Sequence, residues 1–174
     1  IYNHQKTFAS NENDAQENDL IAQIYRDSLL QCKEVPSNVR AFMSAPTLLF
    51  HKKYDNAIHI LDSVYKSYAP YSRDAGIIAY SLASAYQGKN DSENMIKYFA
   101  ISAISDVLNG ARENLSLKIL AKLIFESGDI DRAYKYMKNA MEDAILCNAR
   151  INTIEASDMY LFIDKAFQEK EKNK

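Results

Sequence analysis

The sequence has few residues that make tight turns, and it has no tryptophan. Four glycines and three prolines in 174 residues favour long helices over a fold built from many β-turns. It contains no run of about 18 apolar residues and no signal-peptide pattern. The net charge is −2, so no overall positive field attracts nucleic acid or an anionic lipid surface. The length fits a single domain.

Recognisable catalytic and metal-binding motifs are also missing. Cys32 and Cys147 lie far apart and outside any CxxC pattern, so their redox state stays open. The three histidines have no second histidine or cysteine at metal-ligand spacing. The carboxylates Asp129 and Asp131 sit at an expected helix start, where capping explains them. We therefore expect no catalytic residues, no metal site and no cofactor.

A period of 38 residues organises the apolar and small residues. Ala57, Met95 and Ala133 are spaced by this period. Three further columns keep the same offset: Leu61, Phe99 and Met137; Leu48, Tyr86 and Ile124; Ala45, Ala83 and Ala121. Each period contains two stretches with helical periodicity. A repeat of this length with two helices per unit predicts an all-α helical solenoid.

Helical periodicity and capping residues predict the element boundaries. We expect helices over residues 14–32, 54–68, 73–87, 92–108, 111–126, 130–147 and 150–168, and another from about Asn38. Pro46 lies inside that helix, so we expect either a kink there or a later start. The domain prediction is a frayed lead-in (1–13), one helical domain (14–168) and a solvated, charged tail (169–174).

The columns resemble the tetratricopeptide repeat. The second unit carries Leu82-Ala83, Tyr86, Asn90-Asp91 and Phe99 at that family's positions; the third carries Leu120-Ala121, Gly128-Asp129, Ala133 and Ala140; the first keeps Ala45, Leu48, Tyr54 and Ala57. This resemblance covers roughly residues 38–168. It implies a superhelix of about three helix pairs with flanking helices at both ends, and a role in binding rather than catalysis.

A narrower resemblance runs from Ala111 through Gly128-Asp129 to Asn148-Ala-Arg. This stretch is similar to bacterial membrane-anchored regulators, in which an extracytoplasmic tetratricopeptide region precedes a transmembrane helix and a cytoplasmic part tied to transcription. The chain begins at Ile1 rather than methionine, so we expect a mature or excised fragment. The resemblance implies a periplasmic location; the alternative is cytoplasmic.

The best candidate site is the concave face, which the first helix of each unit lines in tetratricopeptide folds. Helical spacing places Phe42, Tyr80 and Lys118 in one row, with Ser84 and Lys122 one turn further on. The two ammonium groups would hold a peptide carboxylate or another anion. Alternatively, both lysines extend from the core to water without a binding role.

Three functional hypotheses follow, and the absence of catalytic motifs disfavours the third, an enzyme. In the first, the chain is the non-catalytic sensor region of a membrane-anchored bacterial regulator, binding a protein, peptide or small ligand. In the second, it is a stand-alone adaptor or assembly scaffold. Both involve a protein or peptide partner, and an open solenoid end also favours self-association. We expect no nucleic-acid binding by this fragment and membrane attachment only through sequence outside it.

Overall fold

The computed structural model describes residues 12–32, 34–111, 115–146 and 150–173. In these ranges the chain forms helices and no strand, which confirms the predicted all-α fold. The helices are α2 (Glu12–Gln31), α3 (Ser37–Phe50), α4 (Tyr54–Tyr65), α5 (Arg73–Gly88), α6 (Ser92–Leu108), α7 (Leu115–Glu126), α8 (Ile130–Leu146) and α9 (Arg150–Lys172).

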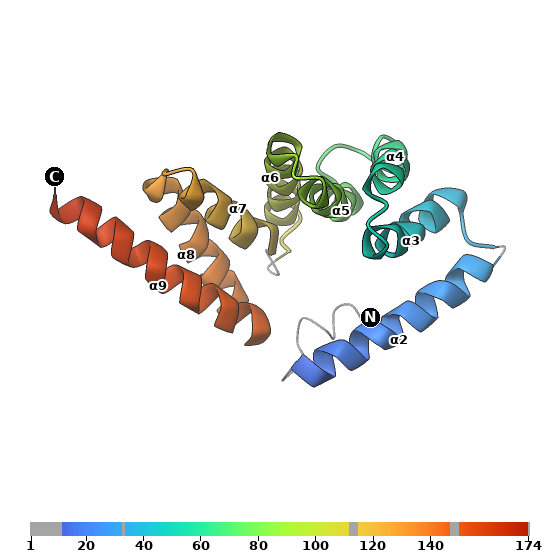
Figure 1. The fold of residues 1–174 in the computed structure, drawn as a ribbon, viewed down its shortest axis with the longest axis horizontal. Helices are drawn as coiled ribbons and strands as arrows, with labels where there is room; N and C mark the ends of the chain where they lie inside the picture. The colour runs from blue at the N-terminus through green and yellow to red at the C-terminus, as the bar shows by residue number, and fades with distance from the viewer. Residues whose placement is uncertain (1–11, 33, 112–114, 147–149, 174) are drawn as a thin grey trace.

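The helices from α3 to α9 follow one another along a curved row (Figure 1). Each packs against the next, so α3/α4, α5/α6 and α7/α8 are antiparallel pairs and α9 packs on α8. Helix α2 stands away from the row and approaches it next to α3. This arrangement is the predicted tetratricopeptide-like array of three helix pairs with a flanking helix at each end.

Several predicted boundaries need correction. Helix α3 begins at Ser37 and contains Pro46, so the later start is wrong. Helix α4 ends at Tyr65, before the predicted residue 68. Helix α9 continues to Lys172, so most of the predicted tail is helical. The predictions for residues 1–11 and for Cys147 fall outside the described residues.

A contact with a residue far away in the sequence explains why α9 continues beyond residue 168. The Lys170 ammonium lies 2.5 Å from a carboxylate oxygen of Asp131, at the start of α8. Lys170 and Lys172 also occupy the last helical turn, where positive charge interacts favourably with the helix dipole. Both effects favour helix over the solvated tail expected from the charged sequence.

The 38-residue period defines the core. The columns Leu61, Phe99, Met137 and Ala45, Ala83, Ala121 are fully buried, and Ala57, Met95 and Ala133 are buried as well. The small residues allow neighbouring helices to approach closely, while the large ones fill the space between them. The remaining column, Leu48, Tyr86 and Ile124, is partly buried and packs at the edge of the core.

The same period recurs in the turn inside each helix pair. Lys52, Asn90 and Gly128 adopt left-handed backbone conformations, with φ of 56°, 59° and 90°. In each turn, the backbone N–H of the next residue donates to the carbonyl oxygen five residues before it, which closes a Schellman motif. These bonds run from Lys53 to Leu48 (2.8 Å), from Asp91 to Tyr86 (3.0 Å) and from Asp129 to Ile124 (3.2 Å). Three identical turns orient the second helix of every pair in the same way.

Replacing Gly128 with alanine should lower the free energy of unfolding by about 1 kcal/mol, because a Cβ is disfavoured in the left-handed region. Nothing lies within 4 Å of the added Cβ, so the cost is confined to the backbone. The reverse substitution, Asn90→Gly, should be neutral or slightly stabilising. Urea unfolding followed by circular dichroism measures both. A Gly128→Ala protein as stable as the original would contradict the assignment of this turn.

The core is divided between two blocks. One cluster joins α3, α4, α5 and α6, with Ile119 and Leu123 of α7 packed against it, and a second joins α7, α8 and α9. A small third cluster of Ala103, Leu117 and Ala140 links them, and beside it the buried Ser116 hydroxyl donates to the hydroxyl of Ser102 at 2.8 Å. Within the described residues the broad link between the blocks is α6 on α7 rather than α5 on α7. The curved row therefore has a seam between its second and third pairs.

Candidate functional site

The predicted row of site residues begins with two aromatic side chains on the first helices of the first two pairs. Phe42 of α3 and Tyr80 of α5 are partly buried and pack against the first core cluster. The Tyr80 ring meets the buried Phe99 ring edge to face, with 5.7 Å between centroids. Helices α3 and α5 also pack on each other.

The polar members of the row lie further along. The hydroxyl of Ser84 donates to the backbone oxygen of Tyr80 at 3.0 Å. Lys118 is partly buried on α7, and Lys122 is exposed with its ammonium 4.0 Å from a carboxylate oxygen of Glu126. An exposed pair of this kind contributes little, so a stronger anion can replace Glu126 at small cost.

The seam separates the two halves of the predicted site. Phe42 and Tyr80 belong to the first block, whereas Lys118 and Lys122 belong to the second. On α7, Ile119 and Leu123 lie beside these lysines and pack against the first cluster. The row is therefore an aromatic half and a cationic half on adjoining blocks. Anion capture by the two lysines therefore stays a prediction.

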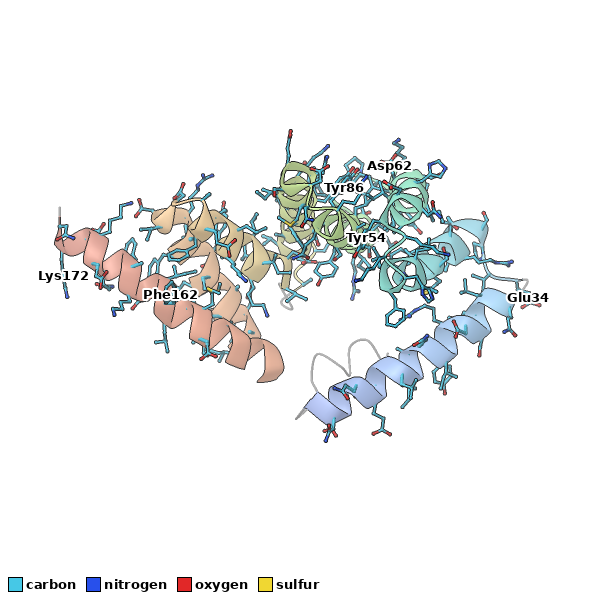
Figure 2. The ribbon with its side chains drawn as sticks, viewed as in Figure 1. Glu34, Tyr54, Asp62, Tyr86, Phe162 and Lys172 are labelled. Atoms are coloured by element: carbon cyan, nitrogen blue, oxygen red, sulfur yellow. The ribbon has the colours of Figure 1, made fainter. Side chains whose placement is uncertain are left out.

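An aromatic cluster that the sequence analysis missed joins α4, α5 and α6. The Tyr86 and Tyr98 rings stack at 5.6 Å, and Tyr65 meets Tyr98 edge to face at 6.0 Å. Burial raises the pKa of all three tyrosines, and the negative charge of Asp62 raises the pKa of Tyr86 and Tyr98 further. Asp62 of α4 and Tyr86 of α5 are labelled in Figure 2. The cluster therefore stays neutral and serves packing. The 38-residue columns contain Tyr86 alone, so periodicity could not reveal the set.

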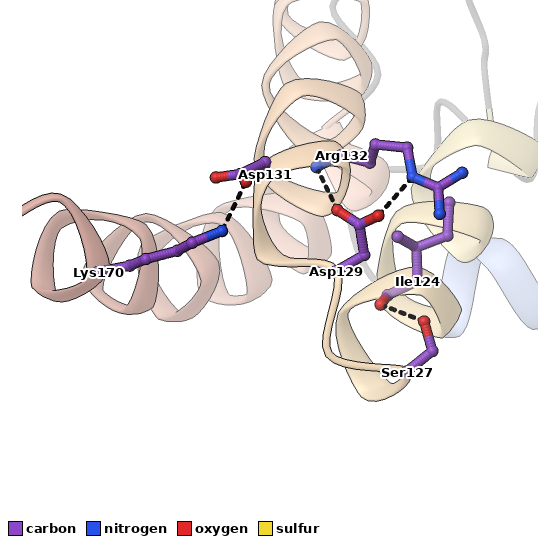
Figure 3. A network of polar contacts seen from close by, with 6 residues as sticks. All are labelled: Ile124, Ser127, Asp129, Asp131, Arg132 and Lys170. Carbon is purple, nitrogen blue, oxygen red and sulfur yellow. Dashed lines mark hydrogen bonds and ion pairs between the residues drawn. The ribbon is translucent and has the colours of Figure 1, made fainter. Parts of the chain in front are cut away.

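The Asp129 carboxylate has the capping role expected from the sequence, whereas Asp131 has a partner on α9 that the sequence did not predict (Figure 3). Asp129 accepts the backbone N–H of Arg132 at 3.0 Å and its guanidinium Nε at 2.6 Å, which lowers the pKa of Asp129. Asp131 pairs with Lys170 of α9. The corresponding residue of the second pair, Asp91, caps α6 through Asn94. These carboxylates fasten helix ends and bridge α8 to α9.

The described residues contain neither a metal-binding cluster nor a membrane-spanning helix. Across the ranges given above, no group of three or more histidine, cysteine, aspartate or glutamate side chains is placed to hold a metal ion. In the same ranges, no helix has the length and apolar character needed to cross a membrane.

The helix pairs, their repeated turns and their shared columns define a tetratricopeptide-repeat domain, a class of fold that mediates protein interaction. A family model described as the SusR N-terminal TPR domain matches residues 1–158. The chain belongs to this family, whose match extends from before α2 into α9. No curated protein matches the chain significantly.

Proposed function

We propose that the chain is the extracytoplasmic binding region of a membrane-anchored bacterial regulator. Two observations support this proposal. The matching family is described as an N-terminal domain, which fits a binding region followed by other parts. The stretch from Ala111 to Arg150 also resembles such regulators. In this proposal the location is periplasmic and the membrane attachment belongs to sequence outside residues 1–174.

The binding element in this proposal is the concave face formed by the first helices. The observation that supports it is that Phe42 and Tyr80 lie partly exposed on the first helices of the first block, while Lys118 and Lys122 lie on the first helix of the adjoining block. Aromatic edges supply apolar contact area, and ammonium groups favour a carboxylate. The partner that suits both is an extended protein segment or peptide with an aromatic or apolar side chain near an acidic group.

The groove proposal is tested by reversing its charge. Peptides ending in a free carboxylate are first selected from a displayed library on the intact chain. The double variant Lys118→Glu with Lys122→Glu should then bind the selected peptide at least about tenfold more weakly by calorimetry, because two attractions become repulsions. Circular dichroism should show unchanged helicity.

A matched control is the variant Lys53→Glu with Lys66→Glu, which makes the same change in total charge at the two ends of α4. It should bind the selected peptide as the original chain does. If the groove variant binds as well as the control variant, Lys118 and Lys122 take no part in binding, and the alternative, that they only extend from the core to water, is correct.

The alternative function is a stand-alone adaptor that uses the same face. The sequence of the complete gene separates the two proposals. A signal peptide before residue 1 together with a hydrophobic span after residue 174 supports the regulator. A complete gene without such segments supports the adaptor.

A further inference from the structure

The Asn109 side chain links the end of α6 to the connection between the first two helix pairs. Its amide nitrogen donates to the backbone oxygen of Tyr71 at 2.9 Å and to that of Ser105 at 2.7 Å. Tyr71 lies one 38-residue period earlier, between α4 and α5, and Ser105 lies in the last turn of α6. We call this pair of hydrogen bonds the Asn109 tether, because one amide caps α6 and holds the preceding connection against it.

The connection needs such a contact because Tyr71 has a left-handed backbone, with φ of 58°. A residue with a Cβ is disfavoured in this region, and the Tyr71 side chain is exposed. The hydrogen bond from Asn109 to the Tyr71 backbone oxygen offsets part of this cost. The tether therefore joins equivalent positions of two successive units and helps to fix the turn between them.

Asn109 is followed by Gly110, and this is the only Asn-Gly pair in the sequence. In such a pair the glycine nitrogen can attack the side-chain carbonyl carbon of the asparagine, because glycine has no Cβ to obstruct the approach. Both residues are exposed, and no described atom lies within 4 Å of a Cβ built at Gly110. The pair therefore has access to water and space in which to react.

We propose that Asn109 is a modification site, at which spontaneous loss of ammonia breaks the tether to Tyr71. The Gly110 nitrogen forms a bond to Cγ of Asn109, the bond from Cγ to the side-chain nitrogen breaks, and the Gly110 proton leaves with that nitrogen as ammonia. A water molecule then opens the cyclic imide, which gives aspartate or isoaspartate at position 109. The reaction needs no oxidant, reductant or second protein.

The surrounding hydrogen bonds slow this reaction in the folded chain. The Gly110 N–H donates to the backbone oxygen of Val107 at 3.3 Å, and the Asn109 amide is held by Tyr71 and Ser105. These bonds must open before the Gly110 nitrogen reaches Cγ. Helix ends open locally at a lower free-energy cost than the whole domain, so the reaction proceeds from the opened end of α6.

The product cannot restore the tether. A carboxylate donates no hydrogen bond, and it places negative charge beside two backbone oxygens at the C-terminal end of α6, where the helix dipole is also negative. The connection between α4 and α5 therefore loosens after the modification. The reaction involves neither Lys118 nor Lys122, so this inference goes beyond the proposed groove function and does not depend on it.

Peptide mapping by mass spectrometry tests the site. The folded chain, kept at mildly alkaline pH, should gain aspartate and isoaspartate at position 109 faster than at Asn90 or Asn94. The urea-unfolded chain should convert at least about fivefold faster than the folded chain, because the end of α6 no longer has to open first. In the unfolded chain, Gly110→Ala should slow the conversion at least about fivefold, because its Cβ obstructs the attacking nitrogen.

The variant Asn109→Asp reproduces one product and tests the tether. The Ser72 N–H next to Tyr71 donates to the backbone oxygen of Ala69 at 3.1 Å, so its exchange with solvent reports on this connection. Exchange at Ser72 and Gly110 should accelerate at least about fivefold in the variant. The matched control Asn90→Asp makes the same change at an exposed asparagine between α5 and α6, and it should leave both amides unchanged.

Three results would each overturn the proposal. Asn109 stays intact in the folded chain, the folded and unfolded chains convert equally fast, or Asn109→Asp leaves exchange at Ser72 and Gly110 unchanged. Peptide binding at the groove is measured separately, so failure of either proposal is distinguishable from failure of the other.

Discussion

Replacing Phe99 with alanine should lower the free energy of unfolding by about 3–5 kcal/mol, the largest effect that we expect from a single core truncation. The Phe99 side chain is fully buried in the cluster that joins α3, α4, α5 and α6. It also contacts the Tyr80 ring edge to face. Truncation removes the transfer free energy of the ring and leaves a cavity between packed helices. Urea unfolding followed by circular dichroism measures the loss.

Phe50 provides a matched control for this change. It is the last residue of α3 and is 82% exposed, with its ring edge to face against His51 at 5.3 Å. Phe50→Ala should change stability by less than about 0.5 kcal/mol. If the two phenylalanine variants lose similar stability, the position of Phe99 at the centre of the first block is wrong.

Because a seam separates the two blocks, the effect of Phe99→Ala should also differ between them. Helical arrays are stabilised by contacts between neighbours, so a local defect weakens its own block first. Amide exchange should therefore accelerate most in α3, α4, α5 and α6. Protection in α8 and α9 should fall less, because those helices belong to the cluster around Met137 and Ile163. Met137→Ala should give the opposite pattern.

The core and the turns could be predicted because both follow one period. A buried column such as Leu61, Phe99 and Met137 repeats wherever the same helix pair repeats. Gly128-Asp129 was recognisable as a helix stop followed by a cap. The matching turn at Lys52 could not be recognised, because a lysine side chain does not indicate a left-handed backbone. Its spacing of one period from Asn90, which is one period from Gly128, reveals the shared geometry.

The features that sequence reasoning missed depend on contacts between distant residues. Helix α9 extends past residue 168, and its Lys170 pairs with Asp131, a partner that no local pattern indicates. The seam arises from how α6 and α7 pack, although the period continues through it unchanged. A repeat pattern therefore placed Tyr80 and Lys118 in one row without showing that they belong to adjoining blocks. The role of that row stays a prediction.

Replacing Gly76 with valine should lower the free energy of unfolding by about 2–3 kcal/mol, because α5 and α6 cross too closely there for a side chain. A Cβ at this position would lie 2.6 Å from the Cβ of Ser105. Ser105 is itself almost fully buried, and its hydroxyl donates to the backbone oxygen of Ile101 at 2.8 Å. The neighbouring helix must therefore shift as a unit, which disturbs packing along the α5/α6 pair.

A double-mutant cycle isolates this steric term from changes in helix propensity. Ser105→Gly removes the atom that the new side chain meets, although glycine inside α6 costs about 1 kcal/mol on its own. If close approach is the cause, Gly76→Val should be less harmful in the Ser105→Gly background, with a favourable coupling of about 1–2 kcal/mol. Additive losses would instead locate the damage away from the α5/α6 crossing.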